Sequence, residues 1–127
     1  MGLIENYIDF LSNCKTERKC ITQIEKEARS KGFASIDEVK DLKAGDKVFV
    51  SKMGKSIALF VIGKKDIAEG MNILGAHLDS PRLDVKQNPV YEKEGIVYLN
   101  THYYGGIKKY QWVALPLAIH GVVCLVD

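Results

Sequence analysis

Hydrophobic side chains near the N-terminus recur at intervals of three and four residues. In residues 3–13 this stripe consists of Leu3, Ile4, Tyr7, Ile8 and Leu11. Such spacing is typical of one face of an amphipathic helix. A second stripe follows Thr16 and consists of Cys20, Ile21, Ile24 and Ala28 among charged and glutamine neighbours. Thr16 is a suitable N-cap and Gly32 favours a helix end, so the pattern predicts two consecutive helices.

Beyond the first third of the chain, the hydrophobic period changes to that of strands. Residues 48–52 and 56–62 flank a turn at 53–55 and predict a β-hairpin. The second arm is apolar on both faces, which is typical of a strand inside a sheet. We expect a further buried strand at 72–76, and it leads directly into His77. The first cluster of chemically capable side chains is therefore expected at a strand end.

Downstream of Pro81, short strand patterns alternate with turns, and no segment has the length and period of a helix. The strand patterns cover 83–86, 96–101 and 118–126, and the turns are Asn88-Pro89, Glu94-Gly95 and Gly105-Gly106. The chain thus changes from helix-rich to strand-rich near residue 86. We therefore expect an α/β fold with two domains, residues 1–85 and residues 86–127.

Composition and charge exclude several classes of function. The 127 residues are enough for a buried core, and a formal net charge of +2 is too small to attract nucleic acid or an anionic membrane strongly. The longest nearly uncharged run, residues 113–126, is shorter than the roughly 18–20 residues that span a bilayer. The N-terminus lacks the basic region of a secretory signal. We expect no nucleic-acid partner and no membrane partner.

The three cysteines indicate the redox environment. Cys14, Cys20 and Cys124 are an odd number and contain no C-x-x-C pair. This pattern favours reduced thiols in a cytoplasm over a disulfide framework. We expect a cytoplasmic protein, in which each cysteine is a small core or surface residue.

Two patterns that suggest ligand binding are better explained by structure. Gly54-Lys55-Ser56 is similar to part of a phosphate-binding loop, but Phe49 stands where that pattern requires glycine, and a strand is expected where it requires a helix. The aromatic and basic residues between Tyr103 and Trp112 have the composition of a nucleic-acid surface. Because the net charge is small, we interpret them as packing or subunit-contact residues.

The tripeptide His77-Leu78-Asp79 has the residue types and spacing of part of a metal site. A histidine at the end of a buried strand holds its imidazole rigidly, and Asp79, two residues on, points to the same side. A carboxylate beside one ring nitrogen fixes the tautomer and strengthens the histidine as a ligand. A hydrogen-bonded structural histidine is nevertheless more frequent than a ligand. His-x-Asp alone leaves both interpretations open.

The wider sequence resembles a known family. The string GAHLDSPRLDVK, from Gly75 to Lys86, resembles the metal-binding signature of the aspartyl-aminopeptidase family of zinc metallopeptidases. Tyr104-Gly105-Gly106, Trp112 and residues 117–123 are similar, in order and spacing, to the segment that the family carries next. The likeness covers most of residues 33–127 and is to a bacterial-type branch.

This resemblance implies both an architecture and a reaction. The architecture is the N-terminal part of a mixed-sheet catalytic domain, followed by the start of a β-rich inserted dimerisation domain. Such domains build dimers that assemble into larger homo-oligomers. The implied reaction removes the N-terminal amino acid of a peptide with one or two zinc ions, or with other divalent metals. Residues 113–116 differ from the acidic and basic pair that follows the tryptophan in some relatives, which leaves an acidic preference open.

The resemblance also implies roles for two residues. His77 resembles the first zinc ligand, and Asp79 resembles the active-site carboxylate that orients it. The other ligands and the general base lie, in that family, beyond the position of Asp127. Asp84 alternates with Val85 along a predicted strand and has no evident partner to tune its pKa.

We therefore expect these 127 residues to be inactive alone, to bind zinc weakly and to expose apolar surface at residues 57–62. The alternative function is that of a non-catalytic oligomerisation or assembly fragment of such a protein. His102 and His120 lie outside the signature, and we assign structural roles to both.

Overall fold

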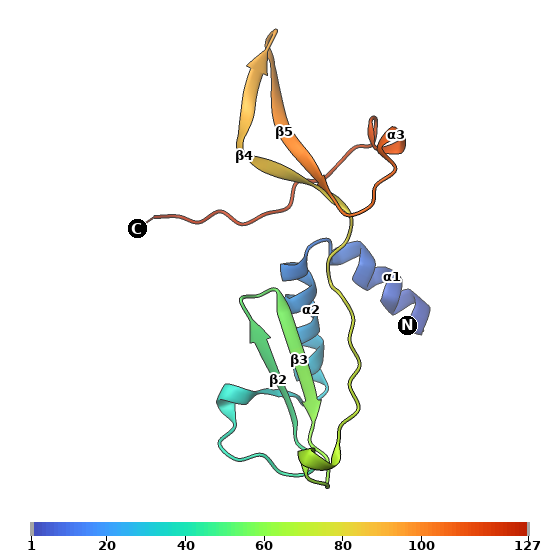
Figure 1. Cartoon of the computed structure of the whole chain (residues 1–127), viewed down its shortest axis with the longest axis vertical. Coiled ribbons are helices and arrows are strands. Elements are labelled where there is room, and N and C mark those ends of the chain that lie inside the picture. The colour runs from blue at the N-terminus through green and yellow to red at the C-terminus, as the bar shows by residue number, and fades with distance from the viewer. Residues whose placement is uncertain (1, 127) are drawn as a thin grey trace. The chain divides into compact units, whose positions relative to one another are not determined.

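The computed structural model describes residues 2–126, and the chain divides into two compact units, Met1–Asp79 and Ser80–Asp127 (Figure 1). The first unit contains α1 (Leu3–Asn13), α2 (Glu17–Ser30), β1 (Ala34–Ser35), the 3₁₀ turn η1 (Ile36–Glu38), β2 (Lys47–Lys52), β3 (Ser56–Val61) and the 3₁₀ turn η2 (Ile67–Glu69). The second contains β4 (Arg82–Lys93), β5 (Ile96–Tyr104) and α3 (Lys109–Trp112). The mixture of helices and strands agrees with the predicted α/β class. The domain boundary between residues 85 and 86 stays a prediction.

Both predicted N-terminal helices are confirmed. The Thr16 side chain accepts a hydrogen bond from the backbone N–H of Lys19 at 3.3 Å, so Thr16 is the N-cap of α2. Beyond the end of α2, Gly32 has a φ of +83°, which favours glycine. The apolar stripe of α1 is exposed along its whole length, and α1 has no buried residue. Helix periodicity therefore predicted α1, although this stripe contributes nothing to the core.

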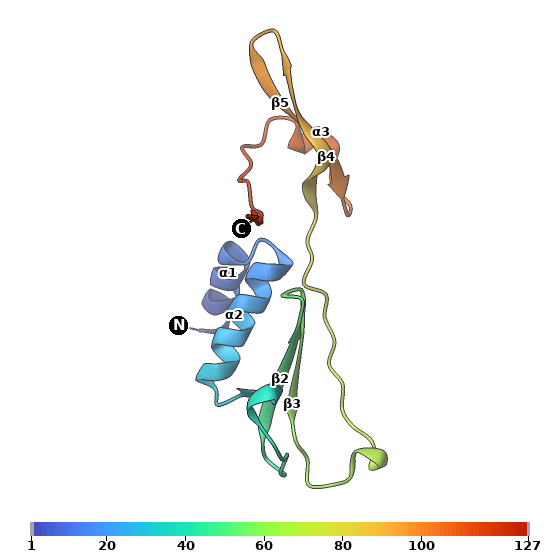
Figure 2. The ribbon, with the colours of Figure 1, turned by 90° about the vertical axis from the view of Figure 1, so that its left-hand side faces the viewer.

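The core of the first unit lies between α2 and the sheet. Figure 2 shows α2 alongside the strands β2 and β3. The buried apolar side chains are Cys20, Ile21 and Ala28 of α2 and Val48 and Phe49 of β2. The Arg29 guanidinium lies 5.0 Å from the centroid of the Phe49 ring and covers one end of this core.

The sheet of the first unit has the order β1-β2-β3. β1 pairs with β2 in parallel, and β2 pairs with β3 antiparallel, from Lys47↔Val61 to Lys52↔Ser56. The predicted hairpin is confirmed. Its turn has positive φ at Met53 (55°) and Gly54 (64°) and is closed by a 3.0 Å bond from Lys55 N–H to the Lys52 carbonyl. Gly54-Lys55-Ser56 is thus a hairpin turn and not a phosphate-binding loop.

Two strand predictions for this unit were wrong in part. β3 is an edge strand and not an interior one, with Leu59 43% and Val61 65% exposed. Residues 72–76 are not assigned to a strand. The described residues provide no further strand to pair with the outer side of β3, and none to pair with residues 72–76. The expected exposure of apolar surface within residues 57–62 is confirmed.

The second unit is built around the antiparallel hairpin β4–β5, paired from Arg82↔Tyr104 to Lys93↔Ile96. The register shifts between Val85 and Val90. The predicted turn at Asn88-Pro89 was wrong, because both residues lie inside β4 at this irregularity. Proline lacks the N–H needed for a regular ladder and is tolerated at such a bulge. The predicted turn at Glu94-Gly95 is confirmed, since both residues have positive φ between the two strands.

The segment after β5 contains little regular structure. α3 has only four residues, and the strand predicted at 118–126 is absent because no described strand pairs with that segment. Among residues 2–126, no helix combines the length and the apolar character needed to cross a membrane.

Candidate metal centre

His77 and Asp79 lie in an extended segment without regular secondary structure, between η2 and β4. A hydrogen bond joins this segment to the helical layer of its own unit. The Cys20 thiol on α2 donates to the backbone carbonyl of Leu78, with 3.7 Å between sulfur and oxygen. The residue between the two candidate side chains is therefore held by the buried face of α2.

The two candidate side chains contact one another. The Nδ1 atom of His77 lies 3.0 Å from the backbone carbonyl oxygen of Asp79 and 3.1 Å from its carboxylate Oδ1. When Nδ1 carries the proton, it donates to Asp79, and Nε2 presents its lone pair outward. The His77 side chain is 84% exposed and that of Asp79 is 35% exposed. The arrangement can thus present one oriented nitrogen ligand to a metal ion.

Within residues 2–126, the structure brings together no group of three or more histidine, cysteine, aspartate or glutamate side chains suited to a metal. A catalytic zinc site usually needs about three protein ligands and an open position for water. His77 fits such a site as one ligand, and Asp79 fits as the group that fixes its tautomer. The described residues therefore supply only part of a metal centre.

The other predicted candidates lie in the second unit. His102 is in β5, opposite Asp84 of β4, and His120 lies in the irregular segment after α3. Asp84 has a partner, contrary to our expectation, because Arg82 Nε donates to its Oδ1 at 2.7 Å. The Arg82 guanidinium also lies 4.1 Å from the ring centroid of Tyr104. The i, i+2 spacing of Arg82 and Asp84 on one strand face was the sequence signal for this pair.

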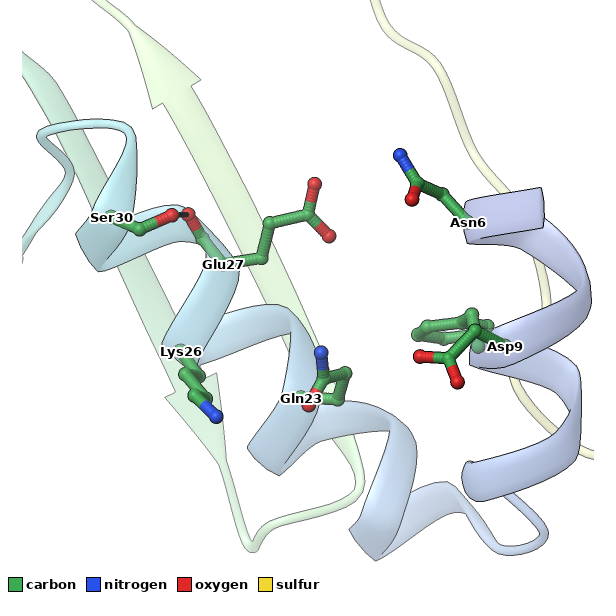
Figure 3. Close-up of a pocket in the computed structure, with 7 residues that line it drawn as sticks. Asn6, Asp9, Gln23, Lys26, Glu27 and Ser30 are labelled. Atoms are coloured by element: carbon green, nitrogen blue, oxygen red, sulfur yellow. Dashed lines mark hydrogen bonds between the residues drawn. The ribbon is translucent and has the colours of Figure 1, made fainter. Parts of the chain in front are cut away.

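A cavity of about 320 Å³ lies between α1 and α2 (Figure 3). It is lined by Asn6, Asp9, Phe10, Gln23, Lys26, Glu27 and Ser30. In Figure 3, Asn6 and Asp9 project from α1, and Gln23 and Glu27 project from α2. The lining includes no histidine, no cysteine and none of the predicted site residues. We therefore do not place the metal centre there.

The comparison with known families defines the class of protein as the zinc metallopeptidases, and the histidine–carboxylate pair is compatible with that class. The chain belongs to the M18 family, because its residues 10–127 match the family described as aminopeptidase I zinc metalloprotease. This match confirms the family that the string from Gly75 to Lys86 indicated.

Among individual proteins, the chain is similar to the probable M18 family aminopeptidase 1 of Clostridium acetobutylicum. The two are 53% identical over 130 residues, which cover 99% of this chain and 28% of the relative. The protein of the same description from Thermotoga maritima is 42% identical over 119 residues, covering 94% of this chain and 26% of the relative. The chain thus spans little more than a quarter of the length of these curated relatives.

Solved structures show the same likeness. The crystal structure of aminopeptidase I from Borrelia burgdorferi matches with a TM-score of 0.80 and 39% identity, covering 91% of this chain and 31% of that one. The M18 aminopeptidase from Thermotoga maritima matches with a TM-score of 0.82 and 40% identity, covering 88% of this chain and 25% of that one. The α/β elements described above are therefore those of M18 aminopeptidases.

Proposed function

We propose that this chain is the N-terminal portion of a zinc-dependent aminopeptidase, which removes the N-terminal amino acid from peptides. The observation that carries the proposal is the family match over residues 10–127. The contact between His77 Nδ1 and Asp79 supports it, because it leaves one imidazole nitrogen available to a metal. When bound, zinc or another divalent ion polarises the scissile carbonyl and lowers the pKa of a bound water.

In this proposal, His77 and Asp79 have different tasks. His77 offers Nε2 as a metal ligand. Asp79 contacts the opposite nitrogen, Nδ1, so its task is to hold the imidazole in one tautomer and one orientation. We assign the remaining ligands, and the carboxylate base that takes the proton from water, to sequence downstream of Asp127.

We also propose that the protein forms dimers and larger homo-oligomers in the cytoplasm. Residues 86–127 would contact a second subunit, and the exposed Tyr103, Tyr104 and Tyr110 support this role, because aromatic side chains are enriched in interface cores. Three cysteines without a disulfide among the described residues support a reducing location.

The test compares two substitutions in the complete protein encoded by the reading frame that contains this chain. We expect His77→Ala to abolish hydrolysis of aminoacyl anilides and to lower the bound metal, because a ligand is lost. We expect Asp79→Asn to lower activity about 10- to 100-fold and to retain metal, because the ligand remains but is poorly oriented. Turnover and metal content by elemental analysis are the measurements.

His102→Ala is the matched control, and it should retain both activity and metal. Full turnover and metal content in His77→Ala would overturn the assignment of the ligand. Chelator-sensitive hydrolysis by the purified 127-residue chain would show that no further ligands are needed. The alternative function, a non-catalytic assembly fragment, requires a stop codon directly after Asp127, whereas our proposal requires the reading frame to continue with further carboxylate and histidine ligands.

A further inference from the structure

Two thiols meet at the connection between α1 and α2. Cys14 caps the C-terminus of α1, where its N–H donates to the Phe10 carbonyl at 2.8 Å. Cys20 lies in the second turn of α2 and is buried. The Cys20 sulfur is 3.6 Å from the Cys14 carbonyl oxygen, and each thiol influences the pKa of the other. Both are free cysteines, so the connection between α1 and α2 holds a reduced dithiol.

The dithiol can be reached from solvent through Cys14. A cavity of about 250 Å³ has Cys14 in its wall, together with Asn13, Arg18, Lys19, Thr22 and Gln23. The Arg18 guanidinium is held in place by a 3.1 Å bond to the Met53 carbonyl. Two cationic side chains beside a partly exposed sulfur suit a small thiol compound that carries carboxylates.

The same dithiol contacts the segment that bears the candidate metal ligand. The Cys20 sulfur lies 3.6 Å from the Cys14 carbonyl oxygen and 3.7 Å from that of Leu78, so its single hydrogen is shared between the two acceptors. Leu78 stands between His77 and Asp79. A disulfide sulfur carries no hydrogen, so oxidation of Cys20 would remove the donor from Leu78.

We propose that Cys14 and Cys20 form a reversible disulfide by exchange with a small carboxylate-bearing disulfide of the glutathione class, and that this disulfide releases the Leu78 carbonyl. Formation of the disulfide is independent of the proposed function. Its consequence for metal binding rests on the proposed function, because it acts through the orientation of His77.

The exchange is balanced in two steps. The Cys14 thiolate attacks one sulfur of the small disulfide, whose S–S bond breaks, and one molecule of small thiol leaves after taking up the proton released by Cys14. The Cys20 thiolate then attacks the Cys14 sulfur and expels the second small thiol, again with one proton transferred. The two protein sulfurs are oxidised, and the small disulfide is reduced to two thiols.

Burial is the main cause that raises the pKa of both Cys14 and Cys20. The carboxylates of Asp9, near Cys14, and Glu17, near Cys20, act in the same direction, whereas the hydrogen bond from Cys20 and the nearby Lys19 lower the pKa of Cys14. Because the thiolate is the attacking species, exchange is slow at neutral pH and accelerates as the pH rises toward these pKa values.

The experiment uses the 127-residue chain treated with oxidised glutathione, quenched with iodoacetamide and digested with trypsin. Trypsin cleaves after Lys15 and Lys19, so Cys14 and Cys20 fall on separate peptides unless a disulfide joins them. We expect the joined Cys14–Cys20 peptide in the oxidised chain, whereas the exposed Cys124 is alkylated or carries a glutathione adduct. Reduced glutathione in excess should restore alkylation of all three cysteines.

Cys124→Ser is the matched control and should form the same linked peptide. Cys14→Ser and Cys20→Ala should each remove it. Separate glutathione adducts on both Cys14 and Cys20 of the wild type, or linkage of either residue to Cys124 only, would overturn the disulfide. Far-UV circular dichroism shows whether each variant remains folded. If Cys20→Ala does not fold, Cys124→Ser still tests the disulfide, because it retains both Cys14 and Cys20.

The second readout follows His77 directly and needs no activity. We expect oxidation to shift the imidazole Cε1–H resonance of His77, which is assigned by its absence in His77→Gln. The His102 and His120 resonances serve as internal references. If the linked peptide forms and the His77 resonance stays in place, the disulfide exists but the coupling to Leu78 is wrong. A failed metal assay in the complete protein would instead contradict the proposed function and leave both of these results intact.

Discussion

At the scale of single residues, the ion pair between Arg29 and Glu38 joins the end of α2 to η1. Its geometry is bidentate, with Nη2 to Oε1 at 2.9 Å and Nη1 to Oε2 at 3.2 Å. The Ser35 N–H also donates to Glu38, at 3.2 Å. The hydrogen bond from Arg29 first, and that from the Ser35 backbone second, lower the pKa of the Glu38 carboxyl below its usual range.

Glu38→Gln should therefore reduce the loss of stability in acid. A carboxyl whose pKa is lower in the folded state contributes stability above its unfolded pKa, and this contribution is lost as the pH falls through the folded pKa. The effect is small because both side chains are exposed to solvent. Urea unfolding of both proteins, from neutral pH down to below the usual glutamate pKa, measures it.

Glu5→Gln, on the exposed α1, is the control for the loss of one negative charge and should leave the contribution of the Arg29–Glu38 pair to acid stability in place. If Glu38→Gln and the wild type lose free energy of unfolding in parallel over this pH range, the ion pair has no role in acid stability.

Residue contacts close in sequence could be predicted from the sequence, and distant ones could not. The Thr16 cap and the proximity of His77 to Asp79 follow from local spacing alone. The contact between Cys20 and Leu78 depends on how a helix and a segment 58 positions downstream pack together, and no local pattern carries that information. Each cysteine was consequently interpreted as an isolated residue.

At the scale of elements, α1 and α2 have the same kind of apolar stripe but opposite surroundings. Ile21 of α2 is 2% exposed and contributes to the core, whereas Ile8 of α1 is 57% exposed. Periodicity predicts both helices because it is a property of neighbouring residues. Burial depends on a packing partner, and among the described residues only α2 has the sheet as its partner.

Ile21→Ala should lower the free energy of unfolding by about 2–5 kcal/mol, because it removes buried methyl groups and leaves a cavity. Ile8→Ala makes the same chemical change in a helix and should alter it by less than about 0.5 kcal/mol. Denaturant unfolding followed by circular dichroism measures both. Equal losses in the two variants would show that the stripe of α1 is buried in solution.

Strands proved harder to predict than helices for the same reason. The hairpins β2–β3 and β4–β5 have partners adjacent in sequence, so alternation and turn signals sufficed. Residues 72–76 and 118–126 have strand composition but no partner in the described chain. Composition alone cannot show where a partner is missing.

At the scale of the whole molecule, apolar surface remains uncovered on both α1 and the edge strand β3. An edge strand with unpaired N–H and C=O groups and exposed hydrophobic side chains is a template for association with another chain. Leu59, Phe60 and Val61 are all exposed on β3. We expect the 127-residue chain to self-associate in a concentration-dependent manner.

Val61→Lys should weaken this association, because a charged side chain on an edge strand opposes pairing. Ser56→Lys adds the same charge to the same strand without removing apolar surface, and it should have the smaller effect. Static light scattering over a concentration series is the measurement. If Ser56→Lys disperses the chain as well as Val61→Lys does, net charge and not apolar surface controls association.

In both hairpins, the turn consists of a non-glycine residue followed by glycine, Met53-Gly54 in one and Glu94-Gly95 in the other. All four residues have positive φ. Such turns match the twist of the flanking strands, so each hairpin can close as soon as its second arm leaves the ribosome. A hairpin closes in about 1–10 μs, whereas synthesis adds only about 5–20 residues per second. When β3 emerges, α2 is already available to cover β2. The first unit is therefore able to fold cotranslationally, before the second hairpin has emerged from the ribosome.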